Sequence, residues 1–582
     1  MDFIRINVNG IDISAPEGMS ILRAVQHADI KYADVDIPTL YYLRDIKEID
    51  DSGVCVVEVA GKQELVQAWS YPICEGMKVL TESERVVTAR KGALEKIMSI
   101  HDRDCVNCVR TANCELQTLA QKYDIKGEKI VGDEKENIDE SSIVIRDSNK
   151  CIRCKRCVTV CESVQGIGAI SAIGDGLNAK IAPVSEDGLV ATDCVNCGQC
   201  ITTCPVGALY EKDNTGDVLG ALEDAEKYVI VQTGPAVRAA LGEEFGFPLG
   251  VDIEGRLAAV LRRLGFDKVF DTKFGADLTT MEEAYEFIDR VRNNGALPMM
   301  TSCCPGWVKF CEQNFPDLIK NLSSCKSPQQ MFGAIAKTYY AEKLGIKKEK
   351  IVVVSVMSCT AKKFEIHRAD ENGAGVPDID ISITTRELAR MIKKAGIQFE
   401  ATPAEEFDQP LGLGTGAAVI YGATGGVMES ALRTAAEKLT GKKLDQIDFE
   451  DVRGMNGIKE ASYDLSGTKI KVAVVSGLEN AKELLTKVRR GDADYQFIEV
   501  MACPGGCVNG GGQPQQRADI RAKSDIRVVR AKALYDNDEM SKTRKAHENP
   551  AIIELYDSFL NEPGSEKAHK LLHTSYVKRR QG

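Results

Sequence analysis

The sequence Met501-Ala-Cys-Pro-Gly-Gly-Cys-Val-Asn-Gly-Gly-Gly-Gln-Pro514 decides how the rest of this chain is interpreted. Cys503 and Cys507 stand four positions apart, and five of the nine residues after Cys503 are glycine. Glycine has no Cβ, so it lets the backbone approach a bulky group closely and adopt positive φ. Beside two thiolate donors, such a run indicates backbone wrapped around an inorganic cofactor. A glycine-rich surface loop with two incidental cysteines is the alternative.

Length and composition describe a large, ordinary globular protein. The 582 residues imply roughly three to five domains, and 43 % hydrophobic with 27 % charged residues is typical of soluble proteins. A formal net charge of −12 argues against a nucleic-acid partner. A strand-like pattern follows Met1 directly, with no signal peptide, no twin arginine and no apolar run long enough to span a bilayer. We therefore expect a cytoplasmic protein without a membrane partner.

Cysteine usage is the unusual feature of the composition. The chain has 20 cysteines, and 11 of them lie between Cys105 and Cys204 in CxxC-type spacings. Disulfide frameworks are a device of small secreted domains, whereas this chain is long and shows no export signal. The clustering therefore predicts metal sites.

Residues 1–80 are predicted to form a small α/β domain. The expected elements are strands over 4–8, 11–14 and 54–59, a hairpin turn at Asn9-Gly10 and a helix over Ile21–His27. This pattern resembles the plant-type ferredoxin module, with its ubiquitin-like fold, that opens complex I large subunits and many iron-only hydrogenases. Four cysteines hold a 2Fe-2S cluster in that module, and the corresponding positions here are Tyr41, Ser52, Cys55 and Trp69.

Three of those four ligand positions have lost their cysteine, and Cys74 lies nearby but off the pattern. Two thiolates rarely hold a 2Fe-2S cluster. We therefore expect the fold to be retained without a 2Fe-2S cluster, as a docking or packing module.

Residues 81–135 contain a compact set of four potential ligands after the helical pattern 87–100: His101, Cys105, Cys108 and Cys114. A structural Cys3His zinc site is one interpretation. The spacing also resembles the 4Fe-4S site with one histidine ligand found in complex I and in the longer hydrogenases. That resemblance implies an accessory 4Fe-4S cluster.

Residues 136–214 carry a duplicated bacterial ferredoxin motif. Three close cysteines of each run bind one 4Fe-4S cluster, and the fourth reaches across to the other cluster. The motif thus predicts two clusters and a path for electrons between them. The first set is Cys151, Cys154, Cys157 and Cys204, and the second is Cys194, Cys197, Cys200 and Cys161.

Residues 215–582 are predicted to form a larger α/β unit. Buried-strand patterns alternate with amphipathic helical patterns, which favours largely parallel sheets, and residues 536–573 are expected to wrap the unit as helices. No GxGxxG follows a strand and no Walker loop occurs, so nucleotide binding finds no support. The predicted strands are 229–232, 350–356, 418–421 and 471–475, and the predicted helices include 254–264 and 384–395.

Three cysteine motifs stand apart within this unit: Thr301-Ser-Cys-Cys-Pro-Gly-Trp307, Met357-Ser-Cys-Thr-Ala-Lys-Lys-Phe-Glu365 and the glycine-rich stretch quoted above. Together they resemble the three signatures of iron-only ([FeFe]) hydrogenases, and the resemblance extends over practically the whole chain. It implies a multi-domain α/β and α+β protein that catalyses 2H⁺ + 2e⁻ ⇌ H₂.

By that resemblance, the catalytic domain holds the six-iron H-cluster, fed by the three accessory 4Fe-4S clusters. Its cubane is held by Cys304, Cys359, Cys503 and Cys507. Cys507 also bridges to a di-iron centre carrying CO, cyanide and an azadithiolate.

The resemblance also assigns residues around the di-iron centre. The Lys362 ammonium is expected to hydrogen-bond an anionic cyanide, and Met357 and Met501 supply polarizable side chains two positions before ligand cysteines. The remaining cofactor-pocket positions are Gly234, Pro235, Gln329 and Ser358.

Cys303 precedes the ligand Cys304 and, by the same resemblance, passes protons to the bridgehead amine. Glu283 and Glu286 are three apart on one face of a predicted helix. With Ser323 and Arg290 they match the family's proton route to solvent. From the residues alone, a solvated acidic helix is the simpler interpretation.

Two positions depart from the family's usual pattern. Ser358 replaces the usual proline before the second ligand cysteine, and Gly234 replaces an alanine before Pro235. Both line the cyanide-bearing pocket in relatives, so we expect altered hydrogen bonding or access there, and infrared CO and cyanide bands that change on Ser358→Pro. Cys311 and Cys325 are expected to be small buried apolar residues.

Catalysis is the favoured interpretation over a slow hydrogen sensor or a non-catalytic electron-relay or assembly relative, because Cys303, Lys362, Glu283 and Glu286 are all present. The resemblance implies maturation enzymes as partners. The electron partner is expected to be a soluble ferredoxin or flavodoxin, or flavin/NAD subunits of a complex.

Overall fold

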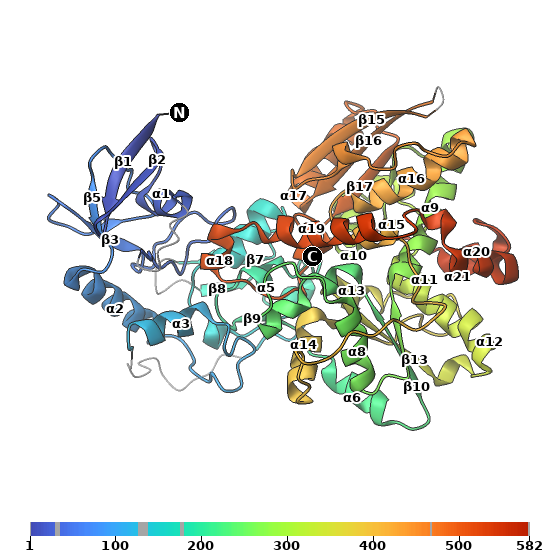
Figure 1. The fold of residues 1–582 in the computed structure, drawn as a ribbon, viewed down its shortest axis with the longest axis horizontal. Helices are drawn as coiled ribbons and strands as arrows, with labels where there is room; N and C mark the ends of the chain where they lie inside the picture. The colour runs from blue at the N-terminus through green and yellow to red at the C-terminus, as the bar shows by residue number, and fades with distance from the viewer. Residues whose placement is uncertain (1, 29–34, 126–137, 175–179, 466–467, 580–582) are drawn as a thin grey trace.

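The computed structural model describes residues 2–28, 35–125, 138–174, 180–465 and 468–579 (Figure 1). The N-terminal unit is a five-stranded sheet in the order β2-β1-β5-β3-β4, packed on the single helix α1 (Ile21–His27). The predicted hairpin at Asn9-Gly10 is confirmed by the antiparallel pairing of β1 and β2. The strands are β1 (Phe3–Val8), β2 (Ile11–Pro16), β3 (Val56–Val59), β4 (Val66–Gln67) and β5 (Lys78–Leu80).

Two helices lead from this sheet to the ferredoxin-like unit, namely α2 (Glu84–Met98) and α3 (Glu115–Lys122). The ferredoxin-like unit has two similar halves, each with a short helix beside a two-stranded sheet. The helices are α4 (Arg156–Thr159) and α5 (Gln199–Thr203), and the sheets pair β6 (Val144–Arg146) with β9 (Leu209–Glu211) and β7 (Ile170–Ile173) with β8 (Lys180–Pro183).

Arg156 ties three parts of the chain together. Its buried guanidinium donates to both carboxylate oxygens of Glu115 on α3, at 2.9 and 2.8 Å, and to the carbonyl oxygen of Tyr42 in the N-terminal unit, at 2.7 Å. A buried cation needs such partners, because an unpaired one is strongly destabilising. The N-terminal unit, the α2–α3 segment and the ferredoxin-like unit are therefore locked to one another.

The first sheet of the large unit consists of four parallel strands in the order β11-β10-β13-β14, and helices cover both of its faces. Side chains of β10 alternate: Ile230 packs toward α9 and α11, whereas Val229 and Val231 pack toward α8 and α14. The prediction of parallel strands is confirmed for this sheet. Its elements are β10 (Tyr228–Thr233), β11 (Lys268–Asp271), β13 (Ile351–Met357), β14 (Ile381–Thr384), α8 (Glu254–Arg263), α9 (Lys273–Arg292), α11 (Pro328–Ile335) and α14 (Thr385–Lys394).

The second sheet has the order β12-β17-β16-β15, and only its edge strand β15 is antiparallel. Helices α10 and α17 cover one face, and α16 with part of α9 covers the other. The elements are β12 (Met299–Met300), β15 (Ile458–Leu465), β16 (Thr468–Ser476), β17 (Phe497–Met501), α10 (Pro305–Asn314), α16 (Gly426–Thr440) and α17 (Leu478–Arg490).

The strand predicted over 418–421 is wrong. These residues form the end of helix α15 (Gly416–Val419) and a following 3₁₀ turn (Ile420–Gly422). The run is buried on all sides, and a short continuous apolar run cannot be assigned to strand or helix by periodicity alone. The deciding feature is tertiary: a Cβ on Gly416 would lie 2.0 Å from Oδ1 of Asp538, so helix α19 (Ile526–Met540) packs directly on α15.

Helix α9 is the longest, with 20 residues, and it lies between the two sheets. Within the described ranges no helix is both long and apolar enough to cross a membrane, and α9 itself buries several charged side chains. It carries Glu282, Glu283, Glu286 and Arg290, which makes it the support of one side of the candidate site.

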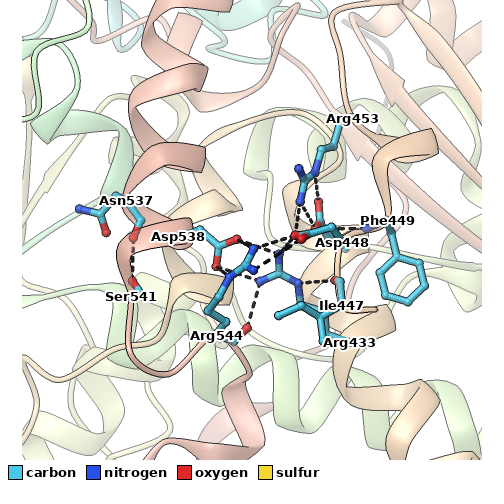
Figure 2. A network of polar contacts seen from close by, with 10 residues as sticks. Arg433, Ile447, Asp448, Phe449, Arg453, Asn537, Asp538, Ser541 and Arg544 are labelled. Carbon is cyan, nitrogen blue, oxygen red and sulfur yellow. Dashed lines mark hydrogen bonds and ion pairs between the residues drawn. The ribbon is translucent and has the colours of Figure 1, made fainter. Parts of the chain in front are cut away.

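The C-terminal helices α19 (Ile526–Met540), α20 (Pro550–Leu555) and α21 (Glu566–Leu572) run across the large unit, as Figure 1 shows. Figure 2 shows how α19 is fixed to α16: Arg433 on α16 donates to both oxygens of Asp538, at 2.9 and 2.8 Å. Arg544 also donates a hydrogen bond to Asp538, and Arg433 donates one to Glu429 within α16. A network of this kind satisfies charges that are fully removed from water.

Candidate functional site

The cysteines predicted to hold the catalytic cubane follow the carboxyl ends of strands in the two sheets. Cys304 comes after β12 and precedes α10, Cys359 follows β13 by two residues, and Cys503 follows β17 by two residues. Ligands of parallel α/β sheets bind at this end of the strands. Both sheets therefore contribute to one site, and Cys507 reaches it from the glycine-rich loop.

The structure brings the four thiols together in the interior. Cys503 and Cys507 each lie close enough to Cys304 and Cys359 for their charges to interact, and little or none of any of the four side chains is exposed. Cys503 is buried, and Cys304, Cys359 and Cys507 are half-buried and free of disulfide bonds, as the donor set of an iron–sulfur cubane requires.

The glycines of the loop test whether such a group fits. A Cβ on Gly510 would lie 2.1 Å from the carbonyl oxygen of Ser358, and one on Gly511 would lie 2.2 Å from that of Cys197. Gly512 is similarly close to Thr384, at 2.8 Å. The loop closes over the thiols only because these positions lack side chains, and the residues present therefore fit a cluster.

Lys362 occupies the pocket next to the four thiols. Its Nζ donates to the carbonyl oxygen of Cys303 at 3.1 Å and to Glu365 Oε2 at 3.0 Å. Burial lowers the pKa of Lys362, but the Glu365 carboxylate and the Cys359 thiol outweigh burial, and the net pKa is raised. The ammonium is therefore a fixed positive charge facing the site.

Glu365 contacts the candidate site and was not identified from the sequence. It accepts hydrogen bonds from Ser327 Oγ at 2.8 Å and Gln329 Nε2 at 2.6 Å as well as from Lys362, so it orients three polar side chains at once. Its spacing of three residues from Lys362 on helix α13 (Ala361–Glu365) was a readable signal. The other two partners come from a distant part of the chain.

Gly234 immediately precedes helix α7 (Pro235–Arg238), and a Cβ there would lie 2.9 Å from the sulfur of Met357. Ser358 is buried and its carbonyl oxygen accepts from the amide of Gly512 at 2.9 Å. The two departures from the family pattern thus lie side by side around Met357.

Cys303 faces an apolar patch formed by Ala276, Ala418, Tyr421, Val427 and Met501. The hydroxyl of Tyr421 is hydrogen-bonded to Thr280 Oγ1 at 2.8 Å. Cys303 is also close enough to Glu283 for the two groups to interact electrostatically.

A series of polar side chains leads outward from Glu283 through Ser323 and Glu286 to Arg290, and we call it the ladder. Ser323 Oγ donates to Glu286 Oε2 at 2.8 Å, and Arg290 donates to Glu286 Oε1 at 2.6 Å. Both carboxyl oxygens of Glu283 are buried without a hydrogen-bond partner among the described residues. Ser323 lies close enough to lower the pKa of Glu283, while its hydroxyl donates to Glu286.

The pKa of Glu283 is raised from 4.5 to about 8, first by burial and then by the neighbouring Glu286 and Glu499 carboxylates. At neutral pH this carboxyl is therefore mainly protonated. A buried group whose pKa lies near the working pH is well suited to pass protons.

The ferredoxin-like cysteines gather in two places. One small cavity is lined by Cys151, Cys154, Cys157 and Cys204, and a second by Cys161, Cys194, Cys197 and Cys200. Each cavity thus combines three cysteines of one run with the fourth cysteine of the other run, as the motif predicts.

The structure places His101, Cys105 and Cys114 around one cavity between α2 and α3. The Nδ1 atom of His101 contacts the Lys150 carbonyl oxygen at 2.9 Å, which leaves Nε2 free to bind a metal. Cys108 is close enough to Cys105 and Cys114 to interact with both. A Cβ on Gly207 would lie 2.5 Å from its sulfur, so this segment packs against the chain just after Cys204.

The altered ligand positions of the N-terminal unit are filled by protein contacts. Tyr41 is buried, and its hydroxyl donates to the Ile152 carbonyl oxygen at 2.6 Å. Ser52 donates to Asp50, Cys55 is fully buried, and Cys74 is exposed. Tyr41 thereby packs against the loop between Cys151 and Cys154.

The second ferredoxin cavity adjoins the four catalytic-domain thiols. Thr360 Oγ donates to the Asn196 carbonyl oxygen at 2.6 Å, and Gln199 Nε2 donates to the Asn509 carbonyl oxygen at 2.8 Å. Cys197 is close enough to Cys359 and Cys503 for their charges to interact.

Five family models match successive parts of the chain. Residues 227–511 match the iron only hydrogenase large subunit, C-terminal domain, and residues 524–579 match the iron hydrogenase small subunit. Upstream, residues 2–84 match a 2Fe-2S iron-sulfur cluster binding domain. Residues 90–129 match an NADH-ubiquinone oxidoreductase-G iron-sulfur binding region, and residues 141–210 a ferredoxin-like domain of NADH-quinone oxidoreductase subunit 3.

Known proteins resemble the chain over its whole length. It is 50 % identical to the NADP-reducing hydrogenase subunit HndD of Solidesulfovibrio fructosivorans, with 100 % of both chains covered. It is 42 % identical to iron hydrogenase 1 of Clostridium pasteurianum, covering 98 % of this chain and 100 % of that one. A variant of apo [FeFe]-hydrogenase HydA1 from Chlamydomonas reinhardtii superposes with a TM-score of 0.57 and 44 % identity, covering 63 % and 99 % of the two chains.

Proposed function

The chain belongs to the iron-only hydrogenase family, and from that premise we propose how its residues divide the work of reversible H₂ formation. The thiolates of Cys304, Cys359, Cys503 and Cys507 would hold the cubane, with Cys507 bridging to the di-iron centre. When bound, this H-cluster supplies low-valent iron with an open position at which two protons and two electrons combine. The protein supplies the pocket, the route for protons and the route for electrons.

The first task is to hold the cofactor in a closed, polarised pocket. Lys362 is fixed by Glu365 and by the Cys303 carbonyl oxygen, so its remaining hydrogen-bonding capacity can be directed to an anionic ligand of the di-iron centre. The glycine-rich loop excludes water by close backbone packing. Gly234, Pro235, Met357, Ser358, Gln329 and Met501 line the same pocket in the proposal.

The second task is to move protons. Cys303 would carry the proton nearest the cofactor and exchange it with Glu283, which is mainly protonated at neutral pH. The Ser323 hydroxyl would connect Glu283 with Glu286, because it donates to one carboxyl at a time. Arg290 holds Glu286 at the outer end, where about 15 % of the Glu286 side chain is exposed. This arrangement of two carboxyls around a hydroxyl is the observation that carries the proposal.

The third task is to move electrons. The packing supports a linear order: the His101 segment, the Cys151/154/157/204 cavity, the Cys161/194/197/200 cavity and then the catalytic cubane. In this proposal the N-terminal unit carries no 2Fe-2S cluster, because side-chain contacts occupy the altered positions.

The test compares iron content and H₂ evolution of the matured wild type with Cys303→Ala. Four cubanes and one di-iron centre give about eighteen irons per chain. Fast evolution in the wild type that collapses in Cys303→Ala at the same iron content supports the proposal. Equal rates in both proteins would contradict the proton role of Cys303, and about twenty irons would contradict the absence of an N-terminal cluster.

The relatives and the matched upstream domains support a proposal for the electron partner. HndD is named as a subunit of an NADP-reducing hydrogenase, and two segments of this chain match domains of NADH-oxidoreductase subunits. We propose that the chain works as a cytoplasmic subunit that exchanges electrons with a nicotinamide-linked partner, with a ferredoxin or flavodoxin as the alternative. Reduction of the purified chain alone by ferredoxin, but not by NADPH, would show that NADPH requires a further subunit.

A further inference from the structure

Glu286, Cys325 and His573 meet at the outer end of the proton ladder. Each of the three offers one ligand atom, and these atoms all lie within 4.8 Å of one another. Cys325 Sγ is 3.7 Å from Glu286 Oε2. The sequence analysis gave Cys325 only a packing role, and neither Cys325 nor His573 belongs to the ladder itself.

Backbone pairing holds this cluster together. Cys325 and His573 form an isolated antiparallel β-bridge, flanked by hydrogen bonds from Lys326 N to Leu572 O and from Thr574 N to Ser324 O, both 2.8 Å. The two side chains therefore emerge side by side although 248 positions separate them in the sequence. Glu286 faces them from α9, and its carboxylate accepts from the Ser324 amide at 3.0 Å.

His573 is supported in the manner of a metal-binding imidazole. Its Nε2 lies 3.1 Å from Glu282 Oε2, and its Nδ1 lies 2.8 Å from the rotatable hydroxyl of Ser324. A carboxylate on one ring nitrogen fixes the tautomer and raises the basicity of the other nitrogen. Glu282 is itself held by Tyr556 and by the Gly564 amide, so the imidazole has a rigid backing.

The donor set selects the kind of cation. Thiolate, imidazole and carboxylate together suit Zn²⁺, whereas Mg²⁺ and Ca²⁺ prefer oxygen ligands alone. Bond lengths of roughly 2.3 Å to sulfur and 2.0 Å to oxygen in a tetrahedron place the two ligand atoms about 3.5 Å apart. The observed 3.7 Å between Cys325 Sγ and Glu286 Oε2 needs little adjustment.

We propose that Glu286, Cys325 and His573 form an inhibitory binding site for Zn²⁺ or a similar soft divalent cation, with water as the fourth ligand. A bound cation coordinates Glu286 Oε2, the atom that accepts the hydrogen bond of the Ser323 hydroxyl. It thereby blocks proton transfer at the outer end of the proton ladder. The inhibitory effect rests on the proposed proton route, whereas the binding site rests on geometry alone. The cation enters beside Glu286, since Cys325 is fully buried and only 5 % of the His573 side chain is exposed.

A second group of potential ligands provides an internal control. Glu437, His547 and Glu548 also bring their ligand atoms within 4.8 Å of one another, but they lack a thiol. Lys545 Nζ lies 2.6 Å from Glu437 Oε1, just as Arg290 lies 2.6 Å from Glu286 Oε1, so the missing thiol is the feature that distinguishes the two groups. A substitution at His547 should therefore leave the zinc effect unchanged.

The experiment adds ZnCl₂ to the matured full-length enzyme, removes unbound metal by desalting and measures three quantities. These are zinc and iron per chain by mass spectrometry, zinc K-edge EXAFS and the rate of H₂ evolution. The proteins compared are the wild type, Cys325→Ala, His573→Gln and the control His547→Gln. Iron content must remain constant, which excludes zinc that displaces iron from the clusters.

In the wild type and in His547→Gln we expect one tightly bound zinc with a sulfur neighbour at about 2.3 Å, and at least tenfold slower H₂ evolution. Cys325→Ala should lose the sulfur neighbour and should require at least thirtyfold more zinc for the same inhibition. His573→Gln should also require more zinc, while its sulfur neighbour remains.

Identical zinc inhibition in the wild type and in Cys325→Ala, or bound zinc without a sulfur neighbour, would overturn the site. Zinc that binds through Cys325 but leaves wild-type H₂ evolution unchanged would retain the site and overturn the route through Glu286. Different outcomes therefore contradict the zinc site and the proton route through Glu286.

Discussion

Gly511 lies directly against Cys197: a Cβ on the glycine would be 2.2 Å from the carbonyl oxygen of the cysteine. This is the point at which the ferredoxin-like unit meets the loop over the catalytic thiols. Contact between these two backbones shortens the path from the second ferredoxin cavity to the catalytic cubane.

Gly511→Ala should therefore separate the two units and reduce H₂ evolution by more than tenfold. The reason is steric, because no real Cβ tolerates a 2.2 Å contact with backbone. Gly216→Ala is the matched control, since a Cβ there meets nothing within 4 Å. Iron content and H₂ evolution of both variants decide the matter; a Gly511→Ala enzyme with wild-type rate contradicts the role of this contact.

Glu283→Gln should lower H₂ evolution by about 10²–10⁴-fold, the usual contribution of a proton-transfer group. Glutamine keeps the shape of the side chain but cannot release a proton at neutral pH. Infrared CO and cyanide bands should persist, which shows that the cofactor is still bound. Asp289→Asn, an exposed acid on the same helix, should keep the wild-type rate.

The stability of the protein should also depend on pH through Glu283. Between pH 4.5 and about 8 the unfolded chain has released this proton while the folded protein keeps it. Unfolding then releases a proton, so the free energy of unfolding decreases as pH rises through this window, by at most about 5 kcal/mol.

Glu283→Gln removes this dependence. The Tm of the variant relative to the wild type should therefore increase between pH 5 and pH 8.5, as followed by circular dichroism. Parallel Tm profiles for the two proteins would show that the Glu283 pKa is not raised.

Glu365→Gln should shift the infrared cyanide bands and slow turnover, because it removes the negative charge that fixes the Lys362 ammonium. Glu387→Gln is a demanding control: it breaks the equally buried ion pair of the neighbouring Lys363, which faces α14 rather than the pocket. Both variants should lose stability, since each leaves a buried cation without its partner. Only Glu365→Gln should move the infrared bands.

Asp538→Asn should destabilise the large unit by about 2–4 kcal/mol, because it leaves Arg433 and Arg544 with less negative charge in a buried network. The expected readout is a Tm lower by about 3–5 °C. Lys532→Gln is the control, since it removes only an exposed pair on the same helix. A Tm unchanged in Asp538→Asn would mean that helix α19 is held by apolar packing alone.

The sequence predicted which ferredoxin-like cysteines come together, because the spacing of cysteines along the chain follows from the geometry of the cluster that they hold. The four-residue step from Cys503 to Cys507 and the duplicated CxxCxxC runs are examples. The predicted helices 254–264 and 384–395 were also found, at α8 and α14, because each shows one clear apolar face. The run 418–421 has no such face, and its helical form depends on packing against Asp538.

Residues whose roles depend on contacts between distant parts of the chain could not be predicted from the sequence. Glu365 gains its role from Ser327 and Gln329, and His573 gains its position from a β-bridge to Cys325. Neither contact produces a periodic pattern in the sequence. In the N-terminal unit the sequence showed the loss of three ligand cysteines. It did not predict that Tyr41 would be buried against the Ile152 carbonyl oxygen.

The interlocking of units by Arg156 bears on the speed of electron flow. Electrons tunnel between clusters at rates that fall exponentially with separation, so a relay whose parts swing relative to one another transmits in bursts. Here one guanidinium joins the Tyr42 carbonyl to Glu115, which fixes the segments that carry the proposed upstream clusters relative to one another. In the proposed relay the distances between these clusters would therefore stay constant, and the rate of electron flow would depend on the driving force applied at either end.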